Sequence, residues 1–253
     1  MRTPSFLIVH FRFFLICVPF IVVLSDIHGH MPRFKSILRQ IKLKDTDTLY
    51  ILGDVIDRNP DGVKILKMIM KMPNVKMLRG NHEHMLLDAL YYHPYPPKPA
   101  WRDHELRLWY RNGGEITNNH WKHSRLDDRE KMTQYLLRLP INIDIEVNGK
   151  PYKLVHGKAL RANPVHNETE EDLIFSAVWD RYLPRFNGPK DTTVIFGHTP
   201  TAYYQTVHPY EVWFGNNLIG IDCGCAYPEG RLACIRLDDM KVFYSKDPEG
   251  KDK

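Results

Sequence analysis

TLYILGDVIDR, residues 48–58, joins a short apolar run to a polar block that holds two aspartates and an arginine. Continuous apolar runs of this length are typical of strands that are buried on both faces of a parallel sheet. Two similar runs, at residues 21–24 and 75–78, are also followed at once by polar blocks. We therefore expect three buried strands, each ending where a group of reactive side chains begins.

The segments between these strands have helical spacing. Apolar residues recur at intervals of three and four within residues 33–43, and residues 61–72 lie between Pro60 and Pro73, which favours a second helix. Right-handed crossovers then bring the carboxyl ends of the strands to one edge of a sheet, where ligands of open α/β sheets bind. The side chains expected to meet at that edge are Asp26, His28, Asp54, Asp57, Asn81 and His82.

The second half of the chain reads as further strands. Residues 141–147 and 152–155 flank Asn148-Gly149 and predict a hairpin that ends at His156. Residues 192–196 predict a strand that leads to His198, and three more strands are expected at 218–222, 231–237 and 241–245. The predicted fold class is α/β. We expect a mixed sheet from the first half to pack on a largely antiparallel sheet from the second, as a two-sheet sandwich flanked by helices.

Five polar blocks stand in order along the chain, and they supply two Asp, one Asn and three His that are suited to binding two metal ions. Each residue also has a plainer explanation. The Asp and Asn residues favour helix caps, and single buried histidines usually bind no metal. Capping does not account for the histidine partners, so we favour the metal site.

The blocks are SDIHG at 25–29, GDVIDR at 53–58, RGNHE at 79–83, VHG at 155–157 and FGHTP at 196–200. Together they resemble the blocks of the calcineurin-like metallophosphoesterases, and among these the phosphoprotein phosphatase branch in its compact bacterial and phage form. The resemblance runs from residue 21 to about residue 245 and implies the four-layer metallophosphoesterase fold.

The resemblance also implies roles for individual residues. It assigns one metal ion to Asp26, His28 and Asp54, and a second to Asp54, Asn81, His156 and His198, so that Asp54 bridges the two. His82, oriented by Asp57, would protonate the leaving group. Three arginines would hold the phosphoryl oxygens: Arg58, Arg79 and Arg181. Arg181 comes from the sequence WDR at 179–181, which resembles a Trp-x-Arg block of the compact members; a structural ion pair is its alternative, and surface charges or ion pairs are the alternatives for Arg58 and Arg79.

The chemistry fits these residue types. Two divalent ions can bind phosphate oxygens and activate a water molecule, and mixed carboxylate, imidazole and amide ligands suit Mn, Fe or Zn better than Ca. We expect Mn, with Fe and Zn as alternatives. Because no Ser or Cys stands in a nucleophile context, direct attack by metal-bound hydroxide is the expected mechanism.

Three functions remain open. The first is a phosphatase acting on phosphoserine or phosphothreonine in proteins or peptides. The second is a symmetrical bis(5'-nucleosyl)-tetraphosphate hydrolase, which would act on a dinucleotide or another small phosphorylated metabolite. The third is an inactive scaffold that binds protein partners; such a protein would be expected to have lost ligands, and this chain retains all of them.

The composition bears on the possible partners, on the state of the cysteines and on the cellular location. The net charge of +5 is spread along the chain, which does not favour a nucleic-acid partner. The four cysteines do not form a disulfide framework for 253 residues, and their expected role is reduced and structural. We expect a cytoplasmic protein, and the oligomeric state stays open.

The chain divides into a hydrophobic leader at 1–19, a single domain at 20–247 and a polar tail at 248–253. Arg12 within the leader makes a membrane anchor unfavourable by about 2.5–3.5 kcal/mol. A small helical cap is expected at about 86–139, broken at Asn112-Gly113-Gly114. Its aromatic residues would either stack on a substrate or fill the core of the cap; they are Tyr91, Tyr92, Tyr95, Trp101, Trp109, Tyr110 and Trp121.

Overall fold

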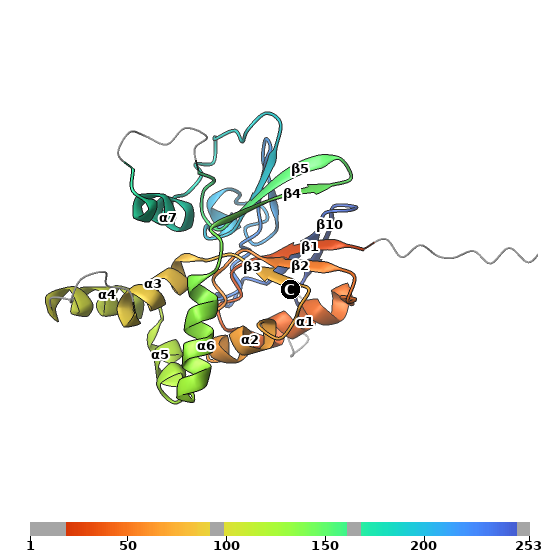
Figure 1. The fold of residues 1–253 in the computed structure, drawn as a ribbon. Helices are drawn as coiled ribbons and strands as arrows, with labels where there is room; N and C mark the ends of the chain where they lie inside the picture. The colour runs from red at the N-terminus through yellow and green to blue at the C-terminus, as the bar shows by residue number, and fades with distance from the viewer. Residues whose placement is uncertain (1–18, 92–98, 161–167, 247–253) are drawn as a thin grey trace, which may run out of the picture.

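A computed structural model describes residues 19–91, 99–160 and 168–246. Its strands form two five-stranded sheets that pack face to face, with helices outside them (Figure 1). The first sheet has the order β10 (Lys241–Tyr244), β9 (Ala233–Arg236), β1 (Ile21–Leu24), β2 (Thr48–Ile51) and β3 (Val75–Met77). The second has the order β4 (Asn142–Val147), β5 (Lys150–Val155), β6 (Thr193–Phe196), β8 (Leu218–Gly220) and β7 (Trp213–Phe214). The predicted two-sheet sandwich is confirmed.

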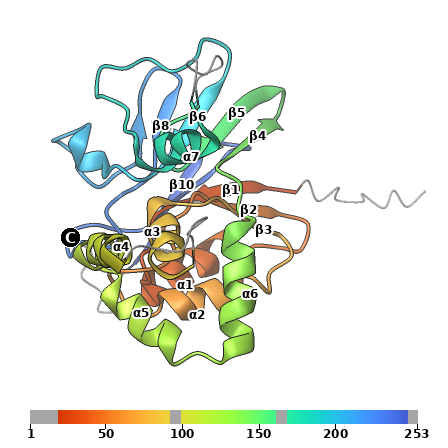
Figure 2. The same cartoon turned by 60° about the vertical axis from the view of Figure 1, so that its left-hand side comes forward.

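The helices gather mainly around the first sheet. They are α1 (Met31–Ile41), α2 (Gly62–Ile69), α3 (Asn81–Leu90), α4 (Pro99–Arg111), α5 (Glu115–Lys122), α6 (Leu126–Leu137) and α7 (Glu170–Trp179). Figure 2 shows α1 and α2 below the first sheet, α4 to α6 beside them, and α7 on the side of the second sheet. A short 3-10 helix covers Thr201–Tyr203.

Burial on both faces explains the continuous apolar runs. In β1, Val22 and Leu24 face the helices and belong to the core that contains Phe34 of α1. Val23, between them, faces the second sheet and packs in the core that contains Leu154. Successive strand residues point to opposite faces, so a strand covered on both sides has no position for a polar residue.

The second sheet differs from the expectation. Only its outer pairs, β4 with β5 and β7 with β8, are antiparallel, whereas β6 pairs in parallel with both β5 and β8. The prediction of a largely antiparallel sheet was therefore wrong. The last two strands, β9 and β10, return to the first sheet, where β9 pairs antiparallel with β1. These pairings join strands that are far apart in sequence, so local patterns do not specify them.

The cap region forms three helices, α4 to α6, between α3 and β4. Trp109 and Trp121 are 0% and 1% exposed and belong to the same core as the first sheet. Of the two alternatives given for the aromatic residues, core packing is therefore the one that holds for Trp109 and Trp121. Tyr91 is exposed. Tyr92 and Tyr95, and the side chain of Trp101, lie outside the residues described.

The leader at 1–18 and the tail from 247 also lie outside the described residues, and the division of the chain at these points stays a prediction. Within the described part, no helix combines the length and the apolar character needed to cross a membrane.

Candidate metal centre

The predicted site residues meet at the carboxyl ends of β1, β2, β5 and β6, with Asn81 at the start of α3. Four of the predicted metal ligands have left-handed backbone conformations: φ is 55° at Asp26, 46° at His28, 53° at Asp54 and 63° at His198. Positive φ is uncommon for residues other than glycine, and such strain collects at functional sites. The strand ends therefore turn sharply to aim these side chains at one place.

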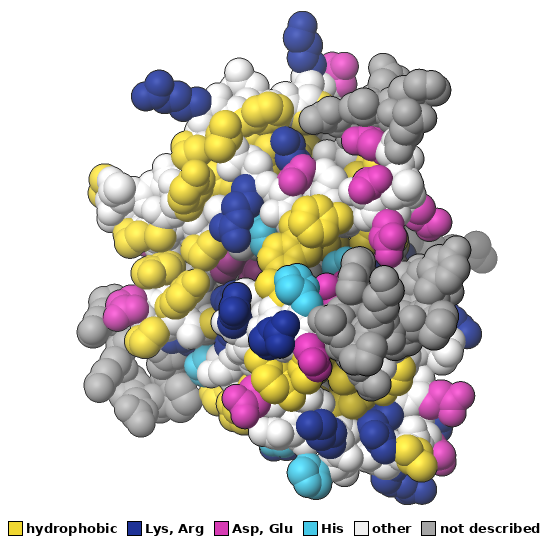
Figure 3. All heavy atoms as spheres, turned by 90° about the vertical axis from the view of Figure 1, so that its left-hand side faces the viewer, with side chains coloured by type: hydrophobic (Ala, Val, Ile, Leu, Met, Phe, Trp, Pro, Cys, Tyr) yellow, Lys and Arg dark blue, Asp and Glu magenta, His cyan; other side chains and the backbone are white. Residues whose placement is uncertain are grey.

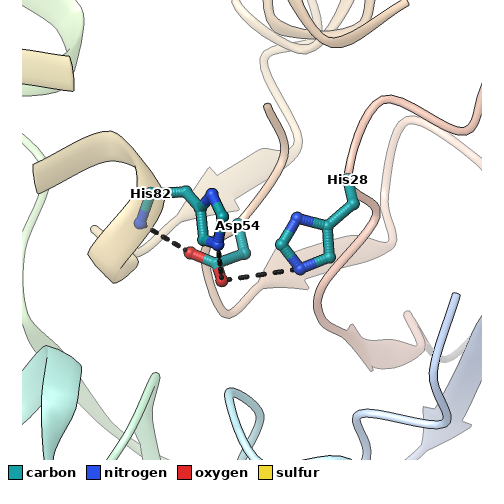
Figure 4. A group of neighbouring side chains, drawn as sticks. All are labelled: His28, Asp54 and His82. Atoms are coloured by element: carbon teal, nitrogen blue, oxygen red, sulfur yellow. Dashed lines mark hydrogen bonds and ion pairs between the residues drawn. The ribbon is translucent and has the colours of Figure 1, made fainter. Parts of the chain in front are cut away.

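The first ligand group contains Asp26, His28 and Asp54, all at most 2% exposed. Nε2 of His28 lies 3.8 Å from Oδ1 of Asp26 and 3.7 Å from Oδ2 of Asp54. Its other ring nitrogen, Nδ1, lies 3.2 Å from the carbonyl oxygen of Ile56. Figure 4 shows a ring nitrogen of His28 and one of His82 directed at the same oxygen of the Asp54 carboxylate.

The second group contains Asp54, Asn81, His156 and His198. Nε2 of His156 lies 2.9 Å from Oδ1 of Asn81 and 3.4 Å from Oδ1 of Asp54. Nδ1 of His198 lies 2.9 Å from the same Asn81 oxygen. The distal nitrogens face backbone carbonyls, with Nδ1 of His156 2.6 Å from that of Leu52 and Nε2 of His198 3.1 Å from that of Trp179.

These contacts fit bound cations. A ring nitrogen that faces a carbonyl must donate its hydrogen, so the opposite nitrogen of the neutral imidazole carries a lone pair. In His28, His156 and His198 that lone pair points at carboxylate or amide oxygens, which also offer lone pairs. Metal-binding histidines characteristically donate their second N–H to a carbonyl or carboxylate. The donor set converges in the way that divalent ions require.

The electrostatics of the cluster lead to the same conclusion. Burial and the Asp222 carboxylate raise the pKa of Asp26 well above its ordinary value. Burial also acts to raise the pKa of Asp54, but the charges of His156 and His82 outweigh it, and this pKa lies well below its ordinary value. Burial acts to lower the pKa of His156, yet the Asp54 carboxylate outweighs it and raises that pKa to about 9. In the absence of cations, bound protons therefore offset the negative charge of the buried acids, and metal binding would displace these protons.

Glu83 supports the site from behind and was not singled out from the sequence. Its fully buried carboxylate accepts backbone N–H groups from Asp54 at 2.8 Å, Val55 at 2.9 Å and Gly80 at 3.0 Å. Burial and the Asp54 charge raise its pKa to about 7. The bond to Gly80 is one half of a capping box at the start of α3, so a glutamate three residues after the cap was the available signal.

Asp222 is a second buried acid that the sequence did not reveal. It is 4% exposed, and its Oδ1 accepts the Gly224 N–H at 2.9 Å. Burial raises its pKa to about 6, and its charge acts on Asp26. It follows β8 by two residues, so its position after a strand was the only sequence signal.

His82 and Asp57 form a separate pair beside the ligands. Nδ1 of His82 lies 2.7 Å from Oδ2 of Asp57, and both residues are 0% exposed. Nε2 of His82 lies 3.8 Å from Oδ2 of Asp54, so that His28, Asp54 and His82 are close enough together to hold a metal ion. The same nitrogen, however, lies 3.2 Å from Nη2 of Arg58. The guanidinium places a positive charge where an ion bound to His82 would have to lie. This geometry favours proton transfer over metal binding at His82.

The three predicted arginines have different surroundings. Arg58 is exposed and adjoins His82. Arg181 is exposed, and its charge adds to burial and to His156 in lowering the pKa of His198 to about 3. Nη2 of Arg79 donates to the carbonyl of Leu137 at 2.7 Å, at the end of α6. The structure therefore brings two of the arginines, Arg58 and Arg181, near the cluster, and the clamp role of all three stays a prediction.

Aromatic side chains of α7 adjoin the second ligand group. The Trp179 ring meets His198 edge-on at 6.1 Å between centroids, and the half-exposed Phe175 stacks on Trp179 at 6.0 Å. Figure 3 shows hydrophobic side chains gathered beside histidines and basic side chains at the middle of this face. Aromatic side chains thus adjoin the second ligand group at His198.

Comparison with known proteins identifies the fold and the family. A profile of the calcineurin-like phosphoesterase family matches residues 21–228. The chain is 30% identical over 227 residues to serine/threonine-protein phosphatase 2 of Salmonella typhimurium. The aligned region covers 85% of this chain and 91% of that protein. It is 24% identical over 242 residues to the asymmetrical bis(5'-nucleosyl)-tetraphosphatase PrpE of Oceanobacillus iheyensis, and this alignment covers 88% of this chain and 90% of that protein.

Among solved structures, a cold-active protein-tyrosine phosphatase of a psychrophilic Shewanella species shares the fold with a TM-score of 0.53. The two chains are 17% identical, and the match covers 90% of this chain and 81% of the other. The profile match extends over most of the sequence and includes all five polar blocks. The resemblance inferred from those blocks is confirmed: this chain is a metallophosphoesterase and belongs to the calcineurin-like phosphoesterase family.

Proposed function

We propose that this protein is a phosphatase that releases phosphate from phosphoserine or phosphothreonine in proteins or peptides. The observation that carries the hydrolytic function is the convergence of ring nitrogens of His28, His156 and His198 on Asp26, Asp54 and Asn81, with the His82–Asp57 pair beside them. The Salmonella relative, which is named as a serine/threonine phosphatase and aligns over most of both chains, supports this substrate class.

The ligand groups fit two divalent ions. In the proposed assignment, Asp26, His28 and Asp54 hold one ion. Asp54 also binds the second ion, together with Asn81, His156 and His198. Oxygen and imidazole ligands together suit Mn, Fe or Zn, and we propose Mn. When bound, the ions supply positive charge that offsets the charge of the phosphoryl group and of the attacking oxygen.

His82 is proposed as the general acid. Its Nδ1 donates to Asp57, which leaves Nε2 facing the cluster, where it can donate a proton to the leaving alkoxide. The Asp57 carboxylate stabilises the protonated ring and fixes its orientation. Arg58 beside it is proposed to donate to phosphoryl oxygens, because a guanidinium matches their spacing. Arg79 and Arg181 are proposed as further phosphate contacts.

A water molecule, rather than a side chain, is the proposed nucleophile. The cysteines that the structure describes, Cys223, Cys225 and Cys234, are free and buried. Burial raises the pKa of each thiol well above its ordinary value, so none provides a thiolate near neutral pH. A phosphoenzyme trapped by rapid acid quench would contradict this proposal.

Hydrolysis of a dinucleoside tetraphosphate is the second candidate. The stacked Phe175 and Trp179 rings beside His198 provide a flat apolar surface on which a nucleobase can lie. The Oceanobacillus relative is named for this activity. The same metal cluster and the same acid would serve either substrate.

Parallel assays test the proposal. The purified protein is supplied with Mn and assayed on a phosphoserine peptide, on p-nitrophenyl phosphate and on a dinucleoside tetraphosphate. We expect the phosphopeptide to have the highest kcat/KM. Asp54→Asn removes a bridging carboxylate and His82→Asn removes the acid, and each is expected to lower kcat by about 100-fold or more.

Wild-type turnover in both variants would show that the site is wrong. Cleavage of the dinucleotide alone would replace the proposed substrate with the second candidate. Absence of turnover on every substrate, with Mn bound, would contradict the enzyme itself and favour a binding scaffold.

A further inference from the structure

Asp57 is held in place from the cap, and this contact assigns the cap a role that the site residues alone do not reveal. The indole Nε1 of Trp109, in α4, donates to Oδ2 of Asp57 at 2.8 Å. The same oxygen faces Nδ1 of His82 at 2.7 Å. All three residues are 0% exposed, so water does not compete for these bonds.

The Asp57 carboxylate depends on this one oxygen for its orientation. Its other oxygen, Oδ1, is buried and has no hydrogen-bond partner within the described part of the chain. The indole N–H and the His82 N–H therefore fix the carboxylate together. Without the indole donor, the carboxylate is free to rotate about its bond to Cβ and away from the line that joins it to His82.

The backbone of the same segment also rests on the cap. Asp57 and Arg58 are consecutive non-glycine residues with φ of 71° and 66°. The Asp57 N–H donates to Oγ1 of Thr117 in α5 at 2.9 Å, and the Arg58 N–H donates to the Gly113 carbonyl at 3.1 Å. Backbone strain of this kind persists only where the surrounding structure holds it. Two cap residues provide that hold.

The turn between α4 and α5 is shaped for these contacts. A Cβ on Gly114 would lie 2.2 Å from Nε1 of Trp109, the donor itself. Gly113 has φ of 94°, and a Cβ there would lie 3.0 Å from Cγ of Arg58. The Asn-Gly-Gly sequence, which predicted only a break between helices, allows the cap to approach Asp57 and Arg58 closely.

We infer that Trp109 and Thr117 are positioning residues for leaving-group protonation, because they hold Asp57 in the orientation that aligns His82. The inference rests on the proposed role of His82. In that step the P–O bond to the leaving group breaks and its electron pair goes to the alkoxide oxygen. The Nε2 proton of His82 moves to that oxygen, and a water oxygen forms the new bond to phosphorus. One proton of this water stays on the phosphate product, and the other is released to solvent, from which His82 is protonated again.

The leaving group distinguishes positioning from general packing. A p-nitrophenolate leaves as a stable anion and needs little protonation, whereas the alkoxide of phosphoserine needs a full proton. Trp109→Phe removes the indole N–H and keeps an aromatic ring, and Thr117→Val removes the hydroxyl and keeps the side-chain shape. We expect each to lower kcat on a phosphoserine peptide by about tenfold and on p-nitrophenyl phosphate by less than about threefold, with KM little changed.

Trp121→Phe is the matched control. Trp121 lies in α5 of the same cap, is 1% exposed, and donates its indole N–H to the hydroxyl of Tyr91 at 2.8 Å. The substitution removes a buried indole donor whose hydrogen-bond partner is Tyr91 rather than Asp57. We expect it to leave the ratio of the two activities at the wild-type value.

Equal losses on both substrates in Trp109→Phe and Thr117→Val, or wild-type activity in both, would overturn the inference. The same would follow if Trp121→Phe changed the ratio as they do. Circular dichroism confirms folding, and if Trp109→Phe does not fold, Thr117→Val decides. His82→Asn separates failure of the proposed acid from failure of the positioning role. If His82→Asn lowers kcat equally on both substrates, the proposed acid is wrong. If His82→Asn affects the phosphoserine peptide more strongly but Trp109→Phe and Thr117→Val do not, the acid stands and the positioning role fails.

Discussion

At Gly80 the backbone passes so close to Asp54 that no side chain fits. A Cβ on Gly80 would lie 2.2 Å from Oδ1 of Asp54 and 2.6 Å from its backbone nitrogen. On the facing strand end, Gly53 has φ of 96°, and a Cβ there would lie 2.6 Å from the Gly80 Cα. Two glycines therefore allow the second and third polar blocks to share one carboxylate.

We predict that Gly80→Ala displaces the Asp54 carboxylate and lowers both metal content and kcat by at least about tenfold, because the proposed bridging ligand has to move. Metal content is measured by elemental analysis after dialysis against limiting Mn. Gly149→Ala is the control, since Gly149 has φ of 73° but no atom within 4 Å of the added Cβ. It should lose about 1–2 kcal/mol of stability through backbone strain and keep its metal.

The proposed ligands were accessible from the sequence because each stands directly after an apolar run. Asp54 follows a run that ends at Leu52, and His198 follows one that ends at Phe196. Trp109 and Thr117 were not accessible, because they reach Asp57 across 52 and 60 residues of sequence. Local patterns report what a strand end carries but not which distant side chain supports it.

At the scale of elements, the sequence identified β1, β2 and β3 to within a residue, because burial on both faces leaves an unbroken apolar run. The strand predicted at 231–237 is shorter, since β9 begins two residues later, at Ala233. The sequence missed α7, although Thr169 and Asp172 form a capping box at its start. It also missed α5, which is only eight residues long and largely polar, so it offers few apolar residues from which a helix could be recognised. The pairing of β9 with β1 joins segments that are far apart in sequence, so it cannot be inferred from the sequence of either strand alone.

Helix α3 carries a partly buried pair whose protonation couples to stability. Nε2 of His84 lies 3.3 Å from Oδ2 of Asp88. Burial and the charge of Arg79 lower the pKa of His84 to about 4. Burial and the charges of Glu105 and Glu171 raise the pKa of Asp88 to about 7. The pair is therefore neutral in the folded protein, with the carboxylic acid donating to the imidazole, rather than an ion pair.

This pair predicts a pH dependence for Asp88→Asn. Between pH 4 and 6.5 the folded pair holds one proton on Asp88 and the unfolded pair holds one on His84, so the wild-type pair contributes no slope. Without Asp88, only the unfolded state binds that proton. Stability should then fall by about 1.4 kcal/mol per unit as the pH drops from 6.5 to 4.

Urea unfolding at several pH values measures this slope against the wild type. The double variant His84→Asn with Asp88→Asn lacks the imidazole as well and should lose the additional slope. An equal pH dependence in the wild type and in Asp88→Asn would contradict the neutral-pair assignment.

Helix α7 is the element expected to select the leaving group. Phe175 is 56% exposed and stacks on Trp179 beside His198. We predict that Phe175→Ala raises KM about tenfold for substrates with an aromatic or nucleobase group, since stacking on an aromatic side chain contributes about 1–3 kcal/mol. KM for a small alkyl phosphate should not change.

Phe214→Ala is the control for this prediction, because Phe214 is 54% exposed but lies on the edge strand β7 of the second sheet. Steady-state kinetics on both substrate types separate the outcomes. A uniform change in KM across substrates would show that Phe175 acts on the fold of α7 rather than on the leaving group.

At the scale of the whole molecule, the candidate metal ligands come from both sheets. Asp26 and Asp54 follow strands of the first sheet, whereas His156 and His198 follow strands of the second. Buried acids surround this junction: Asp26, Asp54, Asp57, Glu83 and Asp222. Their proximity is unfavourable without cations, so the sandwich carries an electrostatic cost at the edge where its sheets meet.

Metal binding should therefore stabilise the entire fold and not only the site. Because the ions bind the folded state, free Mn at about 100 times its Kd should add about 2.7 kcal/mol, and a chelator should remove it. Calorimetric Tm with Mn and with EDTA measures the difference. His198→Ala removes a ligand supplied by the second sheet and should shrink the Mn-dependent rise. His208→Ala, at a side chain that is 66% exposed, should keep the full rise. An equal rise in both variants would mean that the second sheet does not contribute to the metal site, and that the sheets are joined by their apolar core alone.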